Sequence, residues 1–133
     1  MVPHHLVGIA LDDAALRRTD DVRVRHLAFE MNAYQGRELD ALRTLAAGHD
    51  AGHPSPLGMP TDAELAGLER LSGAAFDGAF LTLMIRHHEG AVAMAGSEGR
   101  AGTSAAVRRL ADAVVRVQTA QLDRLRALLA TVP

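Results

Sequence analysis

Two histidine doublets are the residues of this chain whose types and spacing are best suited to chemistry. Each doublet begins three positions after a methionine, and the second doublet is also followed by a methionine. On a helix, side chains three or four positions apart share one face. Thioether and imidazole ligands without a thiolate suit Cu(I) or Ag(I) better than zinc or magnesium. The candidate metal ligands are Met1, His4, His5, Met84, His87, His88 and Met94.

The chain contains an internal repeat that places these two doublets on one another. A shift of 83 positions overlays residues 1–50 on residues 84–133 without a gap. A repeat of this size is one supersecondary unit used twice. Amide and carboxyl side chains of the partner helices are expected at the level of the histidines, and Glu38 is the one acid expected to face the seam. This core polar network comprises Gln35, Glu38, Gln118 and Gln121.

These polar residues are open to three interpretations. The first is a soft-metal site of copper type in a protein that is not an enzyme. The second is a structural or interaction bundle, in which imidazoles bond to Gln and Glu across helices and no metal binds. The third is a di-metal redox enzyme, which needs Glu-x-x-His on two helices. Because Glu-x-x-His does not occur in the sequence, the third interpretation is the weakest and an enzyme is disfavoured.

Apolar periodicity and capping residues predict five helices, over about residues 3–18, 21–45, 61–71, 72–98 and 104–128. In the second helix the apolar stripe is expected to include Met31, Tyr34 and Glu38. Thr61 and Glu64 form a capping-box pattern that opens the short third helix. Three prolines and three glycines make residues 48–60 a loop.

Each repeat is then a helical hairpin that cannot bury its apolar stripe alone. Packing two hairpins together predicts an all-α, four-helix, ferritin-like bundle with a long crossover that contains a short helix. The expected organisation is a single domain over residues 1–133, with repeat one at 1–50, the crossover at 51–72 and repeat two at 73–133.

Helix one starts late relative to its counterpart in the second repeat. About eleven residues, 73–83, precede Met84, whereas none precedes Met1. At about 1.5 Å per residue, helix one is shorter by roughly 16 Å. The difference predicts a chain truncated at its amino end and an apolar groove beside helix one. The alternative is a natural start, with this groove filled by the helix of residues 62–71; a second subunit, in a homodimer, would also fill it.

Composition excludes several classes of protein. The chain has 133 residues, a net charge of −2, 48% hydrophobic residues and no cysteine, so a thiolate site or a disulfide cannot form. All fourteen basic residues are Arg, and no broad cationic face for nucleic acid is evident. The apolar stretches are far shorter than the roughly 20 residues of a membrane span. His49, His53 and Met59 near the linker are expected to be solvent-facing rather than a metal-capture patch.

The stretch from Phe76 to Ala95 resembles the hallmark of the domain of unknown function 305 family, with an Asp, a Phe, Met, His-His, Ala and Met-Ala at its spacings. Residues 35–38 match the later Gln-x-x-Glu of that family, and residues 118–121 resemble it with Gln in place of Glu. Leu11 stands where the first repeat would carry the second motif Met. The resemblance implies a ferritin-like bundle exported by bacteria to the periplasm or the extracellular space. It also implies copper as the bound metal, held by the Met and His residues of the motif.

Overall fold

The computed structural model describes residues 1–47, 57–101 and 104–133 of the chain. These residues form five helices and no strand, which confirms the all-α class predicted from the sequence. The helices are α1 (Val2–Arg18), α2 (Val22–Ala46), α3 (Asp62–Glu69), α4 (Gly73–Ala101) and α5 (Ala105–Leu129).

Local capping explains where three of the helices begin. The Asp21 side chain accepts from the Arg23 backbone amide, and the Ser104 side chain accepts from the Val107 amide. Thr61 and Glu64 form the reciprocal capping box expected for α3. The predicted ends differ by two or three residues, since α3 ends at Glu69 and α4 continues past Gly99 to Ala101.

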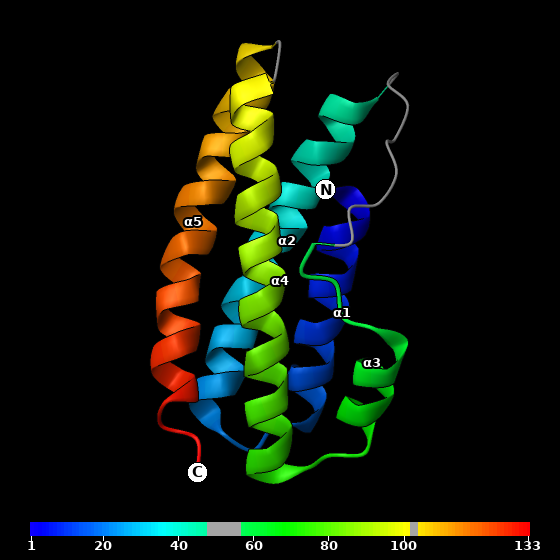
Figure 1. The fold of residues 1–133 in the computed structure, drawn as a ribbon, viewed down its shortest axis with the longest axis vertical. Coiled ribbons are helices and arrows are strands. Elements are labelled where there is room, and N and C mark those ends of the chain that lie inside the picture. Colours follow the sequence, from blue (N-terminus) through cyan, green and yellow to red (C-terminus); the bar gives the residue numbers. More distant parts are fainter. Residues whose placement is uncertain (48–56, 102–103) are drawn as a thin grey trace.

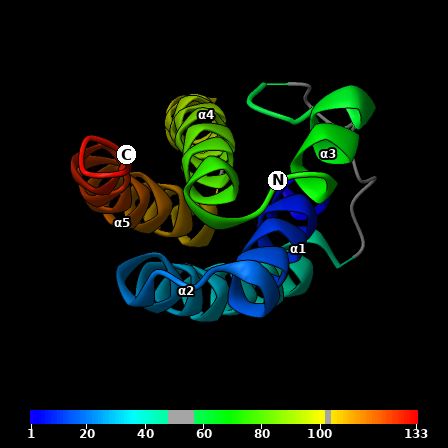
Figure 2. The same cartoon turned by 90° about the horizontal axis from the view of Figure 1, so that it is seen from below.

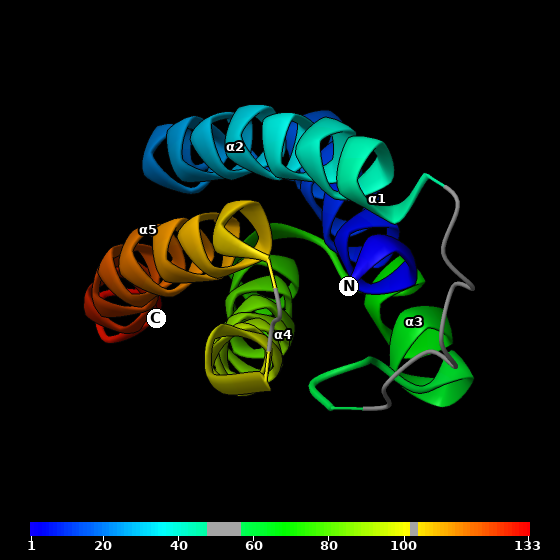
Figure 3. The same ribbon diagram turned by 90° about the horizontal axis from the view of Figure 1, so that it is seen from above.

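The four long helices contact one another in a closed cycle (Figure 1). α1 packs on α2 and α4 packs on α5; the cycle closes through contacts of α2 with α5 and of α1 with α4. Seen along the helices, α3 lies outside this cycle (Figure 2). We call α1–α2 the first hairpin and α4–α5 the second hairpin. The view from above shows the amino end at the start of α1 (Figure 3).

The core consists of two apolar clusters with polar residues between them. The larger cluster contains Phe76, Phe80 and Met84 of α4, and the smaller one contains Ala95 of the same helix. Between these positions, both histidines of α4 are fully buried. We call the buried polar residues at this level the polar layer, which comprises His4, His5, Asp12, Gln35, Glu38, His87, His88, Gln118 and Gln121.

The register of α2 differs from the prediction at one position. Tyr34 is 43% exposed, whereas Gln35 is fully buried. Both fit an apolar stripe that contains Met31, because helical neighbours lie three or four positions apart. The structure selects Gln35, since its side chain has a hydrogen-bond partner on α1.

Two further expectations concern the surface. No helix among the described residues is both long and apolar enough to cross a membrane. His49 and His53 lie outside the described residues, so the structure does not place them. Met59 is half-buried, and its carbonyl oxygen accepts a hydrogen bond from Arg86.

Candidate metal centre

The first histidine of each doublet meets its counterpart where α1 and α4 pack together. The His4 and His87 rings stack with centroids 3.8 Å apart and an interplanar angle of 23°. His4 is 3% exposed and His87 is fully buried. The close pairing follows from the packing of α1 on α4, which brings residues 83 positions apart in sequence into contact.

Each of these two rings forms a hydrogen bond to a backbone carbonyl through one nitrogen. His4 Nε2 donates to the Leu57 carbonyl at 3.1 Å, and His87 Nε2 donates to the His4 carbonyl at 2.8 Å. Both carbonyls only accept, so the protons sit on Nε2. The Nδ1 atoms of both rings are buried and make no hydrogen bond to any described residue.

Burial keeps both rings neutral. Desolvation, followed by the nearby His5, lowers the pKa of His4 to about 4. Desolvation, followed by the stacked His4, lowers the pKa of His87 to about 3. At neutral pH each ring therefore presents an unprotonated, unpaired Nδ1, which is the form in which imidazole binds a metal.

The second histidine of each doublet has both nitrogens engaged. His5 Nδ1 donates to the Met1 carbonyl at 3.1 Å, and His88 Nδ1 donates to the Met84 carbonyl at 3.0 Å. Each Nε2 reaches the partner helix of its own hairpin, where it meets Glu38 or Gln121 at 2.9 Å. The two hairpins therefore hold this pair of rings in equivalent positions.

The two partners differ in charge. Because His5 Nδ1 already donates, its contact with the Glu38 carboxyl needs one further proton, and the bond is charge-assisted when that proton sits on the ring. The same Glu38 oxygen accepts from Gln118 Nε2 at 3.1 Å. Desolvation lowers the pKa of His88, and a neutral ring that donates through Nδ1 needs a donor at Nε2. The structure places Gln121 Oε1 at this contact, and turning the amide over brings its nitrogen to the ring and supplies the donor.

A second carboxyl lies in the polar layer, so the expectation that Glu38 is the one acid facing the core was wrong. Asp12 is fully buried, and its Oδ2 accepts from Gln35 Nε2 at 3.1 Å. Desolvation, followed by the neighbouring Asp13, raises the pKa of Asp12. Asp12 follows His4 by two helical turns on one face of α1, which is the sequence signal that could have identified it. Asp77, also buried, accepts from the Thr19 hydroxyl at 2.5 Å.

The three candidate methionines differ in their surroundings. Met84 is fully buried in the larger apolar cluster, whereas Met1 packs against the smaller one. Met94 is half-buried on α4. Within the described ranges, no three His, Asp or Glu side chains converge as a metal site. The structure thus brings His4 and His87 together but does not gather all seven candidate ligands.

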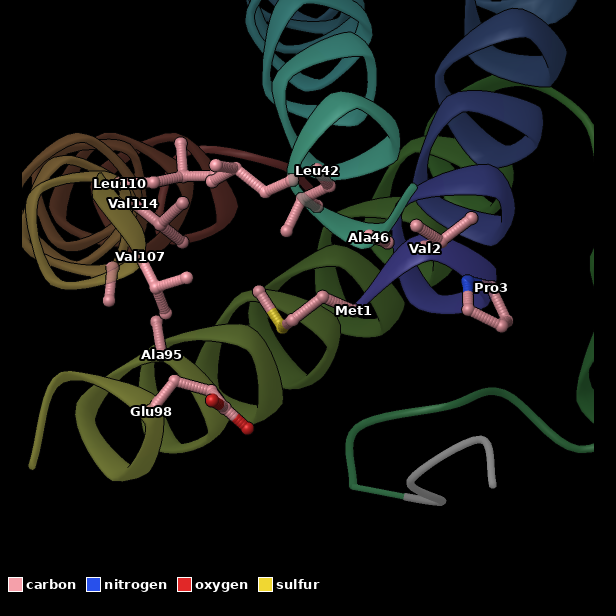
Figure 4. Close-up of a pocket in the computed structure, with 12 residues that line it drawn as sticks. Met1, Val2, Pro3, Leu42, Ala46, Ala95, Glu98, Val107, Leu110 and Val114 are labelled. Atoms are coloured by element: carbon pink, nitrogen blue, oxygen red, sulfur yellow. The ribbon is translucent and has the colours of Figure 1, made fainter. Parts of the chain in front are cut away.

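An apolar pocket lies at the level of Met1 (Figure 4). It encloses about 310 Å³, and Glu98 is the one charged side chain in its lining. None of the four doublet histidines lines it, and neither does any residue of α3. The expectation that the helix of residues 62–71 fills a groove beside helix one is therefore wrong for this pocket. The lining comes from Met1, Val2, Pro3, Leu42, Leu45, Ala46, Ala95, Glu98, Val107, Leu110, Ala111 and Val114.

The polar layer is rich in acceptors without partners. Besides the two Nδ1 atoms, Asp12 Oδ1, Gln35 Oε1 and Gln118 Oε1 are buried and make no hydrogen bond to a described residue. Lone pairs left unmatched in a core are costly unless a donor or a cation meets them. The arrangement is therefore suited to receive a cation.

Comparison with solved structures identifies close relatives. A DUF305 fragment from Deinococcus radiodurans is 32% identical with a TM-score of 0.89, covering 98% of this chain and 90% of that one. A DUF305 protein from Streptomyces coelicolor that is described as secreted is 30% identical, with a TM-score of 0.89 and coverage of 98% and 86%. CopM in its Cu(I)-bound form is 26% identical, with a TM-score of 0.80 and coverage of 96% and 89%. CopM has also been solved in Cu(II)-bound and Ag-bound forms.

None of the curated proteins matches the chain. The model of the DUF305 family, a domain of unknown function, matches residues 1–129. Nearly the whole chain therefore carries the family pattern, including both histidine doublets, and the chain belongs to the DUF305 family.

Proposed function

We propose that this protein binds a soft metal ion of copper type in its polar layer, without being an enzyme. His4 and His87 supply the central ligands through Nδ1. His5 and His88 hold the neighbouring helices in place. The thioethers of Met1, Met84 and Met94 complete the candidate ligand set from the surrounding helices.

The observation that carries this proposal is the pair of free Nδ1 atoms. Both belong to buried rings whose Nε2 atoms are fixed by backbone carbonyls, so the tautomer that exposes an Nδ1 lone pair is already selected. A hydrogen bond at the second ring nitrogen is the usual way in which a protein orients a metal-binding histidine.

Binding one ion requires a local adjustment. A metal lies in the plane of the imidazole that binds it, so the stacked His4 and His87 rings must tilt apart to share an ion. Met84 is one helical turn from His87, and its flexible, polarizable side chain can follow such a change. The metal-bound forms of CopM support the proposal, because a relative with this fold binds Cu(I), Cu(II) and Ag.

A second candidate function is a structural or interaction bundle whose polar layer binds no metal. The observation that favours it is the complete engagement of the His5 and His88 rings, which makes those two residues part of a hydrogen-bond network across helices. Such networks can fix helix register.

Three further expectations belong to the proposal. The cycle of four long helices supports a ferritin-like arrangement of two tandem hairpins. The relative described as secreted supports a periplasmic or extracellular location. A homodimer stays a prediction, to be checked by the mass of the protein in solution, and the pocket beside Met1 is the apolar surface on which to look for the contact.

The proposal is tested by anaerobic titration with Cu(I) against a competing chelator. We expect the His4→Ala, His87→Ala double variant to bind at least tenfold more weakly than the wild type, because both free nitrogens are lost. His26→Ala is the matched control, since His26 is exposed on α2 and outside the polar layer. Equal affinity of the double variant and the wild type would contradict the proposal and favour the structural bundle.

A further inference from the structure

The first hairpin differs from the second at two positions that line the polar layer. With the offset of 83, Gly8 corresponds to Ala91 and Asp12 corresponds to Ala95. All four residues are buried. The first hairpin therefore lacks a methyl group at Gly8 and has an added carboxyl at Asp12, one turn further along α1.

The carboxyl of Asp12 is only partly satisfied. Oδ2 accepts one hydrogen bond from Gln35, whereas Oδ1 has no partner among the described residues. No Arg or His side chain forms an ion pair with it in those parts of the chain. A buried carboxylate without a partner is disfavoured, which is why burial raises the pKa of Asp12 toward the protonated form; a bound cation would replace that proton and stabilise the carboxylate.

Two further acceptors gather over Gly8. A Cβ atom at this position would lie 2.0 Å from Gln35 Oε1 and 2.6 Å from His87 Cε1. A larger residue here would force the ends of both side chains to shift. Gln35 Oε1 and His87 Nδ1, which is bonded to that Cε1, are both buried and unpaired. Gly8 thus forms a cradle over which the side-chain ends of Gln35 and His87 come together, and Gln35 also bonds Asp12, one helical turn along α1.

The cluster consists of acceptors, and the one donor it can offer is the proton that burial favours on Asp12. Among the buried side-chain atoms without a partner in the described residues, the one donor is Arg86 Nε. That guanidinium is paired with Glu64 of α3, away from this cluster. Asp12 Oδ1, Gln35 Oε1 and His87 Nδ1 therefore present lone pairs that no described group in the protein satisfies.

We propose that Asp12, Gln35 and His87 form a second metal site, which takes a divalent cation of borderline softness such as Zn²⁺. Two oxygens and one imidazole nitrogen suit Zn²⁺, Ni²⁺ or Cu²⁺ better than Cu(I) or Ag(I). Three protein ligands are the number found in open zinc sites. The described residues contain no group of three His, Asp or Glu side chains that could hold a metal ion. The proposed set is of another kind, because its third ligand is the amide oxygen of Gln35.

This site shares His87 with the proposed function but does not depend on soft-metal binding. Asp12 and Gln35 play no part in the Cu(I) proposal. His4 plays no part in the divalent site. The two proposals can therefore fail separately.

The test is titration of metal-stripped protein with Zn²⁺ against a chromophoric chelator. We expect one equivalent to bind to the wild type, and at least tenfold weaker binding to Asp12→Asn and Asp12→Ala. Asp12→Asn keeps the shape of the side chain and an acceptor for Gln35, and Asp12→Ala installs the residue of the second hairpin. Asp13→Asn is the matched control, because Asp13 is on the same helix and bonds Asn32 instead. The Cu(I) affinity of Asp12→Asn should stay within about threefold of the wild type.

A second variant closes the cradle without replacing a ligand. Gly8→Ala places a methyl group against Gln35 and His87 and should also weaken Zn²⁺ binding at least tenfold. If Asp12→Asn and Gly8→Ala bind Zn²⁺ as tightly as the wild type, the proposal is overturned. It is equally overturned if Zn²⁺ does not raise the melting temperature of the wild type, a result that does not require any variant to fold. With either of these two outcomes, loss of Cu(I) binding in the His4→Ala, His87→Ala variant would still support the proposed function.

Discussion

The two hairpins hold their second histidines in the same way but place different charges beside them. His5 and His88 both bond the carbonyl four residues earlier and both reach the partner helix at 2.9 Å. The partner is Glu38 in the first hairpin and Gln121 in the second. Asp12, with Ala95 as its counterpart, places a second acid in the first hairpin. Helix geometry is thus common to both hairpins, whereas the buried acids of the polar layer belong to one.

The largest expected effect comes from removing the acceptor of the first hairpin. Glu38→Ala leaves His5 Nε2 and Gln118 Nε2 without their shared partner, so we predict a loss of about 3–5 kcal/mol in the free energy of unfolding. Gln121→Ala removes the partner of one neutral ring, and about 1–3 kcal/mol is expected. Urea denaturation of both variants measures the difference. Equal losses would show that the charge beside His5 adds nothing.

Acid should destabilise the fold through the first histidine of each doublet. The pKa values of His4 and His87 are lowered to about 4 and about 3, so the unfolded chain binds more protons below pH 6.5. Their contribution to stability is complete above pH 6.5 and is lost as the pH falls toward 4. The slope is up to about 1.4 kcal/mol per pH unit for each ring.

Asp12 opposes this trend, because a raised pKa makes acid stabilising. Unfolding is therefore best measured between pH 7 and 5 in the Asp12→Asn background, where we expect the steeper decline. Adding His87→Gln should reduce the slope. A flat profile in the Asp12→Asn background would contradict the burial of neutral rings.

Gly8 and Ala91 offer a comparison of space at equivalent positions. Gly8→Ala forces a methyl group into Gln35 and His87, and a loss of about 1–3 kcal/mol is expected from overpacking. Ala91→Gly removes a buried methyl group and weakens helix α4 by about 1 kcal/mol. Thermal unfolding followed by circular dichroism compares the two. A stabilised Gly8→Ala variant would mean that the cradle does not exist in solution.

The smallest expected effect comes from making the first hairpin resemble the second. Glu38→Gln exchanges a charge-assisted bond for a neutral one, so we predict a loss of about 1 kcal/mol. In the reverse change, Gln121→Glu, a carboxyl replaces the amide that contacts His88 Nε2. The carboxyl should raise the pKa of His88. Nuclear magnetic resonance titration of the ring protons checks this shift. An unchanged pKa of His88 in Gln121→Glu would count against the equivalence of the two contacts.

Much of the fold follows from local signals in the sequence. Three helices start after Asp21, Thr61 and Ser104, whose side chains accept hydrogen bonds from nearby backbone amides. These starts can be predicted from the sequence, because the capping bonds are local. Helix ends are less well determined. Gly99 reads as a stop, yet α4 continues past it to Ala101.

The polar layer is harder to predict, because the decisive partners are far apart in sequence. Periodicity around Met31 admits both Tyr34 and Gln35, and the choice depends on Asp12, 23 residues before Gln35. The roles of the doublet histidines are likewise hidden. His4 and His5 are adjacent in sequence, but one keeps a free nitrogen and the other does not.

The difference between the two members of each doublet is tested most directly by the ¹⁵N resonances of the ring nitrogens, recorded with and without Ag⁺. Without metal, we predict protons on Nε2 of His4 and His87 and on Nδ1 of His5 and His88. On addition of Ag⁺, the Nδ1 signals of His4 and His87 should shift while those of His5 and His88 keep their protonated values. Shifts confined to His5 and His88, or no shift at any of the four rings, would contradict the account.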